Sequence, residues 1–352
     1  MSESIKGRGA AFNPPNRFEK LHLEPLDIER DLEDEIRPVP TIFYKDTSRT
    51  ILAKNDSPDI PFSYSINPYR GCEHGCIYCY ARPSHELLGF SAGIDFETKI
   101  MVKLDAPKLL AEAFRKKTWK PQMVCLSGNT DCYQPAERKL QITRQCLEVF
   151  LRHRNPVGIV TKNFLVTRDL DILNELAALN LVVVSLSITS LHAELIRVME
   201  PRTSAPHKRL EAVEILASAG VPVDINLTPI IPGLNDEEIP TILRESAARG
   251  ATSASFAMLR LPGFVQDLFL DWLRRELPDR STKILNRIKD MRGGALHDSR
   301  WHSRIRGEGE ITKTIGELFR LTCEKYGLNK KNFEFSLNHF RRLPQGQEEL
   351  FG

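Results

Sequence analysis

The stretch RGCEHGCIYCYAR, residues 70–82, places three of the chain's seven cysteines within eight positions. Cys72, Cys76 and Cys79 form a CxxxCxxC pattern in a loop that Gly71 and Gly75 flank. Thiolates bind zinc and iron-sulfur clusters, and a closed site of either kind normally has four protein ligands. This stretch supplies three. A cubane cluster held by three cysteines keeps one iron open to an external ligand, which is a catalytic arrangement rather than one for electron transfer alone.

The overall composition is that of a globular protein. The chain has 352 residues, of which 41% are hydrophobic and 27% charged, enough for one large domain or two ordinary ones. Its net charge of +3 is small against 49 Lys and Arg and 46 Asp and Glu, so total charge gives no argument for nucleic-acid binding. Residues 1–20 lack the apolar stretch of a signal peptide, and no apolar run is long enough to span a bilayer. We therefore expect a cytoplasmic protein without membrane attachment, in a reducing compartment that suits metal ligation better than disulfides.

Short apolar runs alternate with amphipathic stretches along the middle of the chain. The alternation predicts parallel strands joined by right-handed helical crossovers, in either an open doubly wound sheet or an incomplete β/α barrel. Two of the amphipathic stretches end on Gly220 and Gly250, where left-handed C-caps are expected. The predicted strands are 62–66, 123–127, 157–161, 181–188, 221–230 and 251–259, and the main predicted helices lie in 135–154, 169–180, 204–220 and 235–250.

Three regions follow from this reading. Residues 1–60 form an N-terminal extension without periodicity, which we expect to be partly disordered apart from a short charged stretch, 26–37, that has helical character. Residues 61–270 form the core domain. Residues 271–352 form a helix-rich C-terminal segment that we expect to cover the barrel mouth.

The cysteine pattern has an aromatic residue, Tyr78, directly before its third cysteine. In this it resembles the radical S-adenosylmethionine (radical SAM) enzymes. The resemblance implies a 4Fe-4S cluster held by Cys72, Cys76 and Cys79, whose open iron binds S-adenosylmethionine. It also implies reductive cleavage of that cofactor to methionine and a 5′-deoxyadenosyl radical, which abstracts a hydrogen atom from the substrate, and an electron donor such as flavodoxin or ferredoxin. The implied fold is α/β, a six-stranded partial (β/α) barrel with the cluster loop after its first strand, which agrees with the six predicted strands.

Two alternatives compete with this interpretation. The first is a zinc knuckle in which His74, His85 or a distant cysteine completes the ligand set, as in a non-catalytic, zinc-stabilised interaction protein. The second is an iron-sulfur redox sensor that does not cleave the cofactor. Metal analysis and a test for 5′-deoxyadenosine separate the three.

The sequence stretches around the cysteines indicate a particular branch of this family. Residues 67–86, TKN at 161–163, 199–221 and TPIIPGLND at 228–236 resemble the branch of radical SAM proteins related to spore photoproduct lyase, a DNA repair enzyme. The resemblance does not fix the reaction, because kinship does not determine chemistry. The substrate is therefore unknown, with nucleic acid or a nucleotide as a candidate.

The resemblance also implies cofactor-binding positions at the mouth of the barrel. Polar residues after the second strand would take the place of the family's Gly-Gly-Glu motif, and a Lys after the third strand and a Ser ending the fourth would approach the cofactor. A cation in the loop before residues 204–220 would reach the cofactor or pair with Glu200. The candidates are Tyr78, Ser127, Asn129, Thr130, Asp131, Lys162, Ser187, Arg202 and Asn226.

A further cysteine is a candidate catalytic residue. Spore photoproduct lyase uses an extra cysteine after its second strand as a hydrogen-atom donor, and Cys125 and Cys132 both lie near that place. Cys132 lies beyond the strand in the polar loop, where we expect it to face the cavity, so it is the candidate donor, although a small buried thiol is the preferred interpretation. Cys125, Cys146 and Cys323 are expected in the core.

The stretch 297–310 interleaves cations with Trp301. Such a pattern can hold phosphate and stack a base. A solvated loop in which Glu308 and Glu310 pair with the cations explains it equally well.

Overall fold

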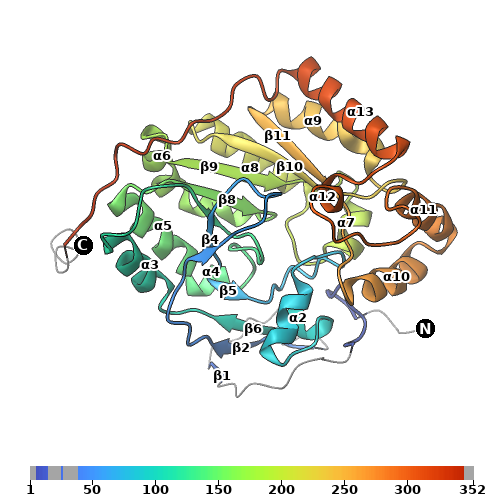
Figure 1. Cartoon of the computed structure of the whole chain (residues 1–352), viewed down its shortest axis with the longest axis horizontal. Coiled ribbons are helices and arrows are strands. Elements are labelled where there is room, and N and C mark those ends of the chain that lie inside the picture. The colour runs from blue at the N-terminus through green and yellow to red at the C-terminus, as the bar shows by residue number, and fades with distance from the viewer. Residues whose placement is uncertain (1–4, 15–24, 27–38, 345–352) are drawn as a thin grey trace.

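A seven-stranded sheet forms the centre of the computed structural model, which describes residues 5–14, 25–26 and 39–344 (Figure 1). Its strand order is β11-β10-β9-β8-β7-β4-β3, with six neighbouring strands parallel and β3 antiparallel at one edge. In the described structure β11 and β3 do not pair with each other, so the barrel is partial. The strands are β3 (Ala53–Lys54), β4 (Tyr64–Ile66), β7 (Val124–Leu126), β8 (Val157–Thr161), β9 (Val182–Ser187), β10 (Val223–Ile230) and β11 (Ser253–Met258).

The six parallel strands fall within the six predicted runs, and the predicted α/β partial barrel is confirmed. The sequence of each strand sorts its side chains between two faces, because successive side chains point to opposite sides. In β9, Val182, Val184 and Leu186 have no exposed area, whereas Ser187 on the other face lines the pocket described below. Apolar residues thus meet the helices, and polar residues face the barrel interior.

Helices surround the outer face of this sheet (Figure 1). Gly220 (φ 80°) and Gly250 (φ 95°) follow α8 and α9 in the left-handed conformation that was predicted. The stretch 135–154 forms two helices, because the chain turns at Gln141 with φ 50°. The helices are α2 (Ile94–Thr98), α3 (Ala106–Arg115), α4 (Glu137–Leu140), α5 (Ile142–His153), α6 (Leu170–Ala178), α7 (Ala193–Met199), α8 (Pro206–Ser218) and α9 (Ile239–Ala248), with 3-10 helices η1 (Arg82–Leu88), η2 (Phe164–Asp169) and η3 (Asp236–Glu238).

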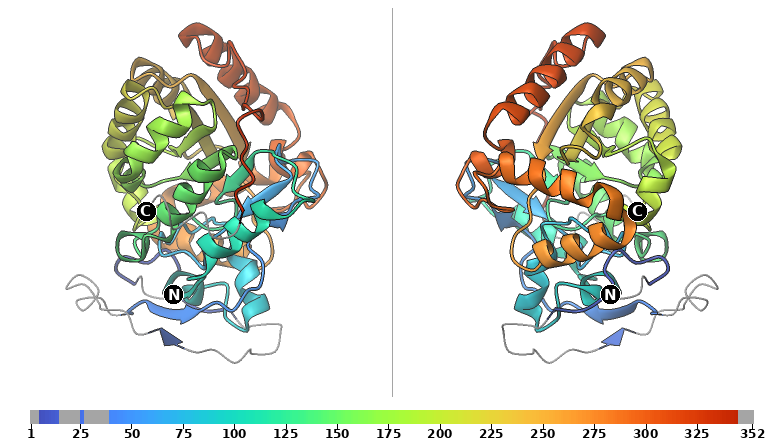
Figure 2. Two further views of the ribbon diagram at one scale, coloured as in Figure 1. Left: turned by 90° about the vertical axis from the view of Figure 1, so that its left-hand side faces the viewer. Right: turned by 90° about the vertical axis from the view of Figure 1, so that its right-hand side faces the viewer.

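A second, four-stranded sheet was not predicted. Its order is β1-β2-β6-β5, and it lies at the end of the molecule away from α13 (Glu310–Tyr326) (Figure 2). Strand β5 leads directly into the cysteine loop, so this sheet positions the start of that loop. The strands are β1 (Pro25–Leu26), β2 (Ile42–Lys45), β5 (Tyr69–Arg70) and β6 (Lys99–Val102).

The N-terminal residues 5–14 pack beneath the cysteine loop. Glu97 accepts hydrogen bonds from the backbone N–H groups of Gly9 (3.1 Å) and Ala10 (2.9 Å). A Cβ atom on Gly9 would lie 1.9 Å from the carbonyl oxygen of Gly75, so only glycine fits there. This part of the extension is therefore integral to the fold, while the charged stretch expected to be helical lies, from residue 27 on, outside the described residues.

The C-terminal region is helix-rich, with α10 (Val265–Glu276), α11 (Pro278–Asp290), α12 (Ser303–Arg306) and α13. Near the pocket, Asp59 accepts hydrogen bonds from Arg304 Nε (2.6 Å) and the His302 N–H (2.7 Å), which joins α12 to the loop before β4. Beyond α13 the chain runs past the opposite end of the strands, where the Ser336 N–H donates to the Asn180 carbonyl (3.0 Å) (Figure 1). The segment thus reaches both ends of the barrel. None of the described helices has the length and apolar character needed to cross a membrane.

Candidate functional site

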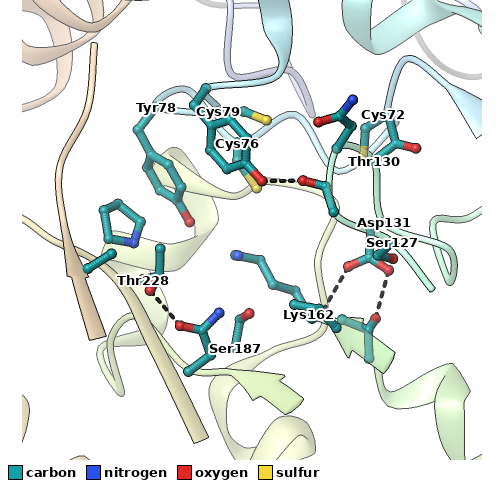
Figure 3. Close-up of a pocket in the computed structure, with 18 of the residues that line it drawn as sticks. Cys72, Cys76, Tyr78, Cys79, Ser127, Thr130, Asp131, Lys162, Ser187 and Thr228 are labelled. Atoms are coloured by element: carbon teal, nitrogen blue, oxygen red, sulfur yellow. Dashed lines mark hydrogen bonds between the residues drawn. The ribbon is translucent and has the colours of Figure 1, made fainter. Parts of the chain in front are cut away.

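A cavity of about 320 Å³ opens at the carboxyl ends of the parallel strands (Figure 3). Its size lies within the range of small-molecule sites, and its position is where barrel enzymes place their site residues. All three clustered cysteines line it. The lining residues that were predicted from the sequence are Cys72, Cys76, Tyr78, Cys79, Ser127, Asn129, Thr130, Asp131, Lys162, Ser187 and Asn226.

A buried ion pair holds the cysteine loop in place. Arg82 and Glu97 have no exposed side-chain area, and their Nη2 and Oε1 atoms are 2.6 Å apart. Arg82 also donates to the carbonyl oxygen of Cys76 from Nε (3.1 Å) and Nη2 (2.9 Å). Gly75 (φ 68°) permits this close packing, because a Cβ atom there would lie 2.8 Å from Glu97 Oε2. The loop conformation is therefore fixed from within the protein.

Cys72 is buried and Cys76 and Cys79 are partly buried, and desolvation raises the pKa of each thiol above its ordinary value. Nearby cations oppose this effect: Lys162 lowers the pKa of Cys76, and Arg82 and Lys162 lower the pKa of Cys79. A metal centre would displace the thiol protons, since the thiolate is the ligand.

The donor set fits a cluster better than a single ion. Among the described residues, no three His, Cys, Asp or Glu side chains are arranged to ligate one metal ion. Both ring nitrogens of His74 already have partners, Asp131 (3.3 Å) and Asn163 (3.2 Å). His85 does not line the cavity. The structure thus gives no support to a zinc knuckle completed by either histidine, whereas three thiols opening on one cavity suit a cubane with a vacant iron.

His85 is instead a core histidine. It is buried, stacks on Phe90 (ring centroids 5.1 Å apart), and lies edge-on to Phe96 (5.5 Å). Burial lowers the pKa of His85 from 6.5 to about 4, and Asp95 opposes this only in part.

The protein should therefore lose stability in a defined acidic window. Because the folded pKa of His85 is below its unfolded value, the unfolded state binds the proton more strongly, so the free energy of unfolding falls as pH drops from about 6.5 towards 4. The loss due to His85 is about 2 to 3 kcal/mol. Thermal unfolding of wild type and His85→Phe between pH 7.5 and 4.5 measures it, and the variant should show a smaller fall. Equal falls in the two proteins would contradict the assignment.

Tyr78 is positioned by a buried carboxylate, Glu200. The Tyr78 hydroxyl donates to Glu200, which also accepts from Thr189 Oγ1 (2.5 Å) and pairs with Arg209. Burial alone would raise the pKa of Glu200, but Arg209 and Lys162 together with these hydrogen bonds bring it to about 2. Glu200 thus stays ionised and fixes the tyrosine ring at the pocket wall.

Asp131 is also ionised, and its oxygens are already engaged. It accepts from Thr161 Oγ1 (2.7 Å), the Lys162 N–H (2.8 Å) and the Tyr133 N–H (2.9 Å), and it faces His74. Burial opposes its ionisation, but His74 and these hydrogen bonds hold the pKa of Asp131 at about 2. Its main visible role is to tie the loop after β7 to the end of β8.

Of the other candidates after β7, two make hydrogen bonds within the protein and one remains available to a ligand. Ser127, with φ 90°, accepts through Oγ from the Cys132 N–H (3.0 Å), and Thr130 Oγ1 donates to the Tyr69 carbonyl (2.7 Å). Asn129 is exposed, and within the described structure its side-chain amide has no hydrogen-bond partner. Of these residues Asn129 keeps the most capacity to bind a ligand.

Lys162 follows β8, Ser187 ends β9, and Asn226 lies within β10 opposite Ser187, and all three line the cavity. The Lys162 side chain extends into the pocket, with Nζ 5.9 Å from the centroid of the Tyr78 ring (Figure 3). No described residue accepts a hydrogen bond from this ammonium. Asn226 Oδ1 accepts from the hydroxyl of Thr228, which also lines the cavity. These strand ends therefore offer one available cation and several small polar groups.

The expectation that Cys132 faces the cavity is wrong. Its side chain has no exposed area and packs in the core, while Cys125 lines the cavity. The reason is strand alternation: in β7, Val124 and Leu126 point to the helices, so Cys125 points inward. If a thiol outside the cluster set acts as a hydrogen-atom donor, Cys125 rather than Cys132 is positioned for it.

Arg202 also lies outside the cavity. Its guanidinium pairs with Glu73 (Nη1 to Oε1, 3.0 Å) and approaches Thr41 (3.3 Å), rather than binding a ligand or pairing with Glu200. Because Glu73 lies within the cysteine loop, Arg202 supports that loop.

Several pocket residues were missed. Tyr80 directly follows the cysteine pattern, Arg260 follows β11, and Ile305 belongs to α12. The general rule that barrel sites gather at strand ends could have found Arg260. Nothing local marks Ile305, which the tertiary fold brings in.

The cation-rich stretch 297–310 is largely neutralised. Arg300 pairs with Asp298 (2.8 Å) and Glu308 (3.0 Å), and Arg304 pairs with Asp59. Glu310 pairs with Lys313 on its own helix. The interpretation as a loop with charge partners is thus supported, with Glu308 in the expected role and Glu310 not.

Comparison with known proteins places this site in a family context. A family model described as the Radical SAM superfamily matches residues 66–245. An uncharacterized protein of Mycobacterium tuberculosis (strain ATCC 25618 / H37Rv) is 36% identical over 222 residues, which are 62% of this chain and 65% of that protein, less than two thirds of its length. An uncharacterized protein of Methanocaldococcus jannaschii is 30% identical over 175 residues, 50% of this chain and 63% of that one.

Among solved structures, spore photoproduct lyase complexed with dinucleoside spore photoproduct has a TM-score of 0.57 and 17% sequence identity, and the match covers 81% of this chain and 80% of that one. At this identity the likeness concerns the fold alone. It agrees with the partial barrel.

Proposed function

The chain belongs to the radical SAM superfamily, and we propose from this membership that it is an enzyme that binds a 4Fe-4S cluster and S-adenosylmethionine and abstracts a hydrogen atom from its substrate. The observation that carries the proposal is the opening of three thiols, Cys72, Cys76 and Cys79, on one cavity at the carboxyl ends of the strands. The bound pair would supply an electron and a sulfonium for reductive cleavage. A one-electron donor of the flavodoxin or ferredoxin kind would be the required partner.

The residues of this chain would bind and orient the cofactor. Lys162 offers the carboxylate of the cofactor an ammonium that donates no hydrogen bond to any described residue, since a charge-assisted hydrogen bond is strongest where water is scarce. Asn129 offers an available amide, and Tyr78, fixed by Glu200, forms a wall. Asp131, Ser127 and Thr130 hold the loop that carries Asn129.

The substrate would occupy the outer part of the same cavity. Cys125 lies on its wall and is the thiol outside the cluster set that a bound substrate can meet. A nucleic-acid or nucleotide substrate is favoured by the fold shared with spore photoproduct lyase, which has been solved in complex with a dinucleoside spore photoproduct. The reaction itself is not specified by these features.

Anaerobic reconstitution tests the proposal. We expect about four irons and four sulfides per chain, since one cubane contains that number, and formation of 5′-deoxyadenosine on addition of S-adenosylmethionine and a strong reductant. Deuterium transfer into 5′-deoxyadenosine from labelled nucleic-acid, nucleotide and peptide candidates would then identify the substrate. Zinc instead of iron would support an interaction protein, and a stable cluster without 5′-deoxyadenosine would support a redox sensor.

A further inference from the structure

Arg260 occupies the outer rim of the cavity, two residues beyond the end of β11. Its guanidinium carbon lies 5.5 Å from the centroid of the Tyr80 ring. The hydroxyl of Tyr80 donates to the carbonyl oxygen of Gly128, which fixes that ring across the pocket from β11. The side chain of Arg260 is thereby held at the entrance, over an aromatic surface.

Among the described residues, Arg260 differs from Arg292, Arg300 and Arg304 in having no hydrogen-bond acceptor. Arg304 pairs with Asp59, and Arg300 pairs with Asp298 and Glu308. Arg292 donates to three backbone carbonyl oxygens, those of Leu259 (2.6 Å), Ser303 and Arg304 (3.0 Å). In the described part of the chain no carboxylate or carbonyl accepts a hydrogen bond from Arg260, and its Nε atom is buried without a partner.

A partly buried cation without a partner is unfavourable for the protein alone. Burial lowers the pKa of Arg260 below its ordinary value, and the neighbouring Arg304 lowers it further. Burial lowers the pKa of His297, Arg260 and Arg292 lower it further, and its Nδ1 is buried without a partner in the described structure. Asp59 and Asp298 act against these effects on Arg260 and His297, but Asp59 already binds Arg304 and Asp298 binds Arg300. Arg260 therefore keeps unused donors at the cavity wall, and charged groups held in this way are typical of ligand-binding positions.

We propose that Arg260 binds an oxyanion of the substrate, a phosphate or a carboxylate, at the mouth of the cavity. This rests on the proposed function in taking the cavity as the substrate site. Arg260 presents a planar set of donors that matches either group. The cavity also has an apolar lining, formed by Ile60, Phe62, Met258 and Ile305. We therefore expect the substrate to have an apolar part next to its anionic group. Lys162 acts on the thiols of Cys76 and Cys79, whereas Arg260 lies over Tyr80, so we assign the cofactor anion to Lys162 and the substrate anion to Arg260.

Two pairs of probes, each a charged and a neutral form of one shape, test the assignment. They are uridine 5′-monophosphate with uridine, and phenylacetate with phenylacetamide, and binding to the full-length protein is measured by ligand-observed nuclear magnetic resonance without S-adenosylmethionine. We expect wild type to bind at least one charged member about tenfold to a hundredfold more tightly than its neutral form. Arg260→Gln should lose that preference, and Arg260→Lys should keep part of it. The pair that shows the preference identifies the anion as phosphate or carboxylate.

Arg300→Gln is the matched control, because it removes the same charge from an arginine that does not line the cavity and has two acid partners. It should change the preference less than about twofold. The melting temperature of Arg260→Gln should equal or exceed that of wild type, since the variant removes a desolvated cation; a merely structural arginine would give a lower one. Equal binding of both members of each pair to wild type, or a preference that survives Arg260→Gln, overturns the proposal. Failure to form 5′-deoxyadenosine would instead count against the proposed function, because these binding measurements do not involve it.

Discussion

Cys76→Ala should abolish both cluster assembly and formation of 5′-deoxyadenosine. The protein offers three thiolates to the site, and the described residues contain no other His, Cys, Asp or Glu arranged with them to replace a lost ligand. Removing one leaves two protein ligands for a cubane that needs at least three. Iron and sulfide content after anaerobic reconstitution gives the first readout, and 5′-deoxyadenosine formation gives the second.

Cys323→Ala provides the control for this experiment. Cys323 is a buried thiol on α13, away from the cavity, so its removal should leave iron content unchanged. Normal iron content in Cys76→Ala would show that the loop does not hold the cluster, and the proposed function would then lose its main support.

The barrel could be predicted from the sequence because each of its parallel strands is a local signal. An apolar run such as 181–188 is long, β-branched and bounded by turn residues, and β9 lies inside it. The second sheet lacked such signals, since β1 and β5 are two residues each, and β6 follows α2 without an intervening turn. Its pairing depends on contacts between distant segments, which periodicity does not report.

The site was predicted in part for the same reason. The spacing of the three cysteines is a local pattern, and the resemblance to the lyase branch pointed to Lys162 after the third strand and Ser187 at the end of the fourth, both of which line the cavity. Cys132 was misplaced because the direction of its side chain in the loop after β7 is set by tertiary packing, and Arg202 because it pairs with the distant Glu73. Arg260 belongs to no sequence motif. Only the structure shows that Arg300 and Arg304 have acid partners whereas Arg260 has no acceptor among the described residues.

Glu97→Ala should be the most destabilising of the substitutions considered. Glu97 is fully buried, pairs with the buried Arg82, and accepts from the Gly9 and Ala10 N–H groups. Breaking a buried ion pair by removing one partner costs about 3 to 5 kcal/mol, because the remaining charge stays in a poorly solvated place. Denaturant unfolding measures this loss of free energy.

The loss should extend to the metal site, which a general destabilisation would not require. Arg82 also holds the Cys76 carbonyl, so a displaced guanidinium loosens the cysteine loop, and iron content at temperatures where the variant stays folded should fall below that of wild type. Glu211→Ala is the control, since its ion pair with Lys208 has a similar distance (2.7 Å) but is about half exposed on α8, and such pairs contribute about 0 to 1 kcal/mol. If Glu97→Ala unfolded no more easily than Glu211→Ala, the buried pair would not be what fixes the loop, and the geometry of the three thiols would have to depend on Gly75 and the backbone contacts of Cys72 and Ile77 instead.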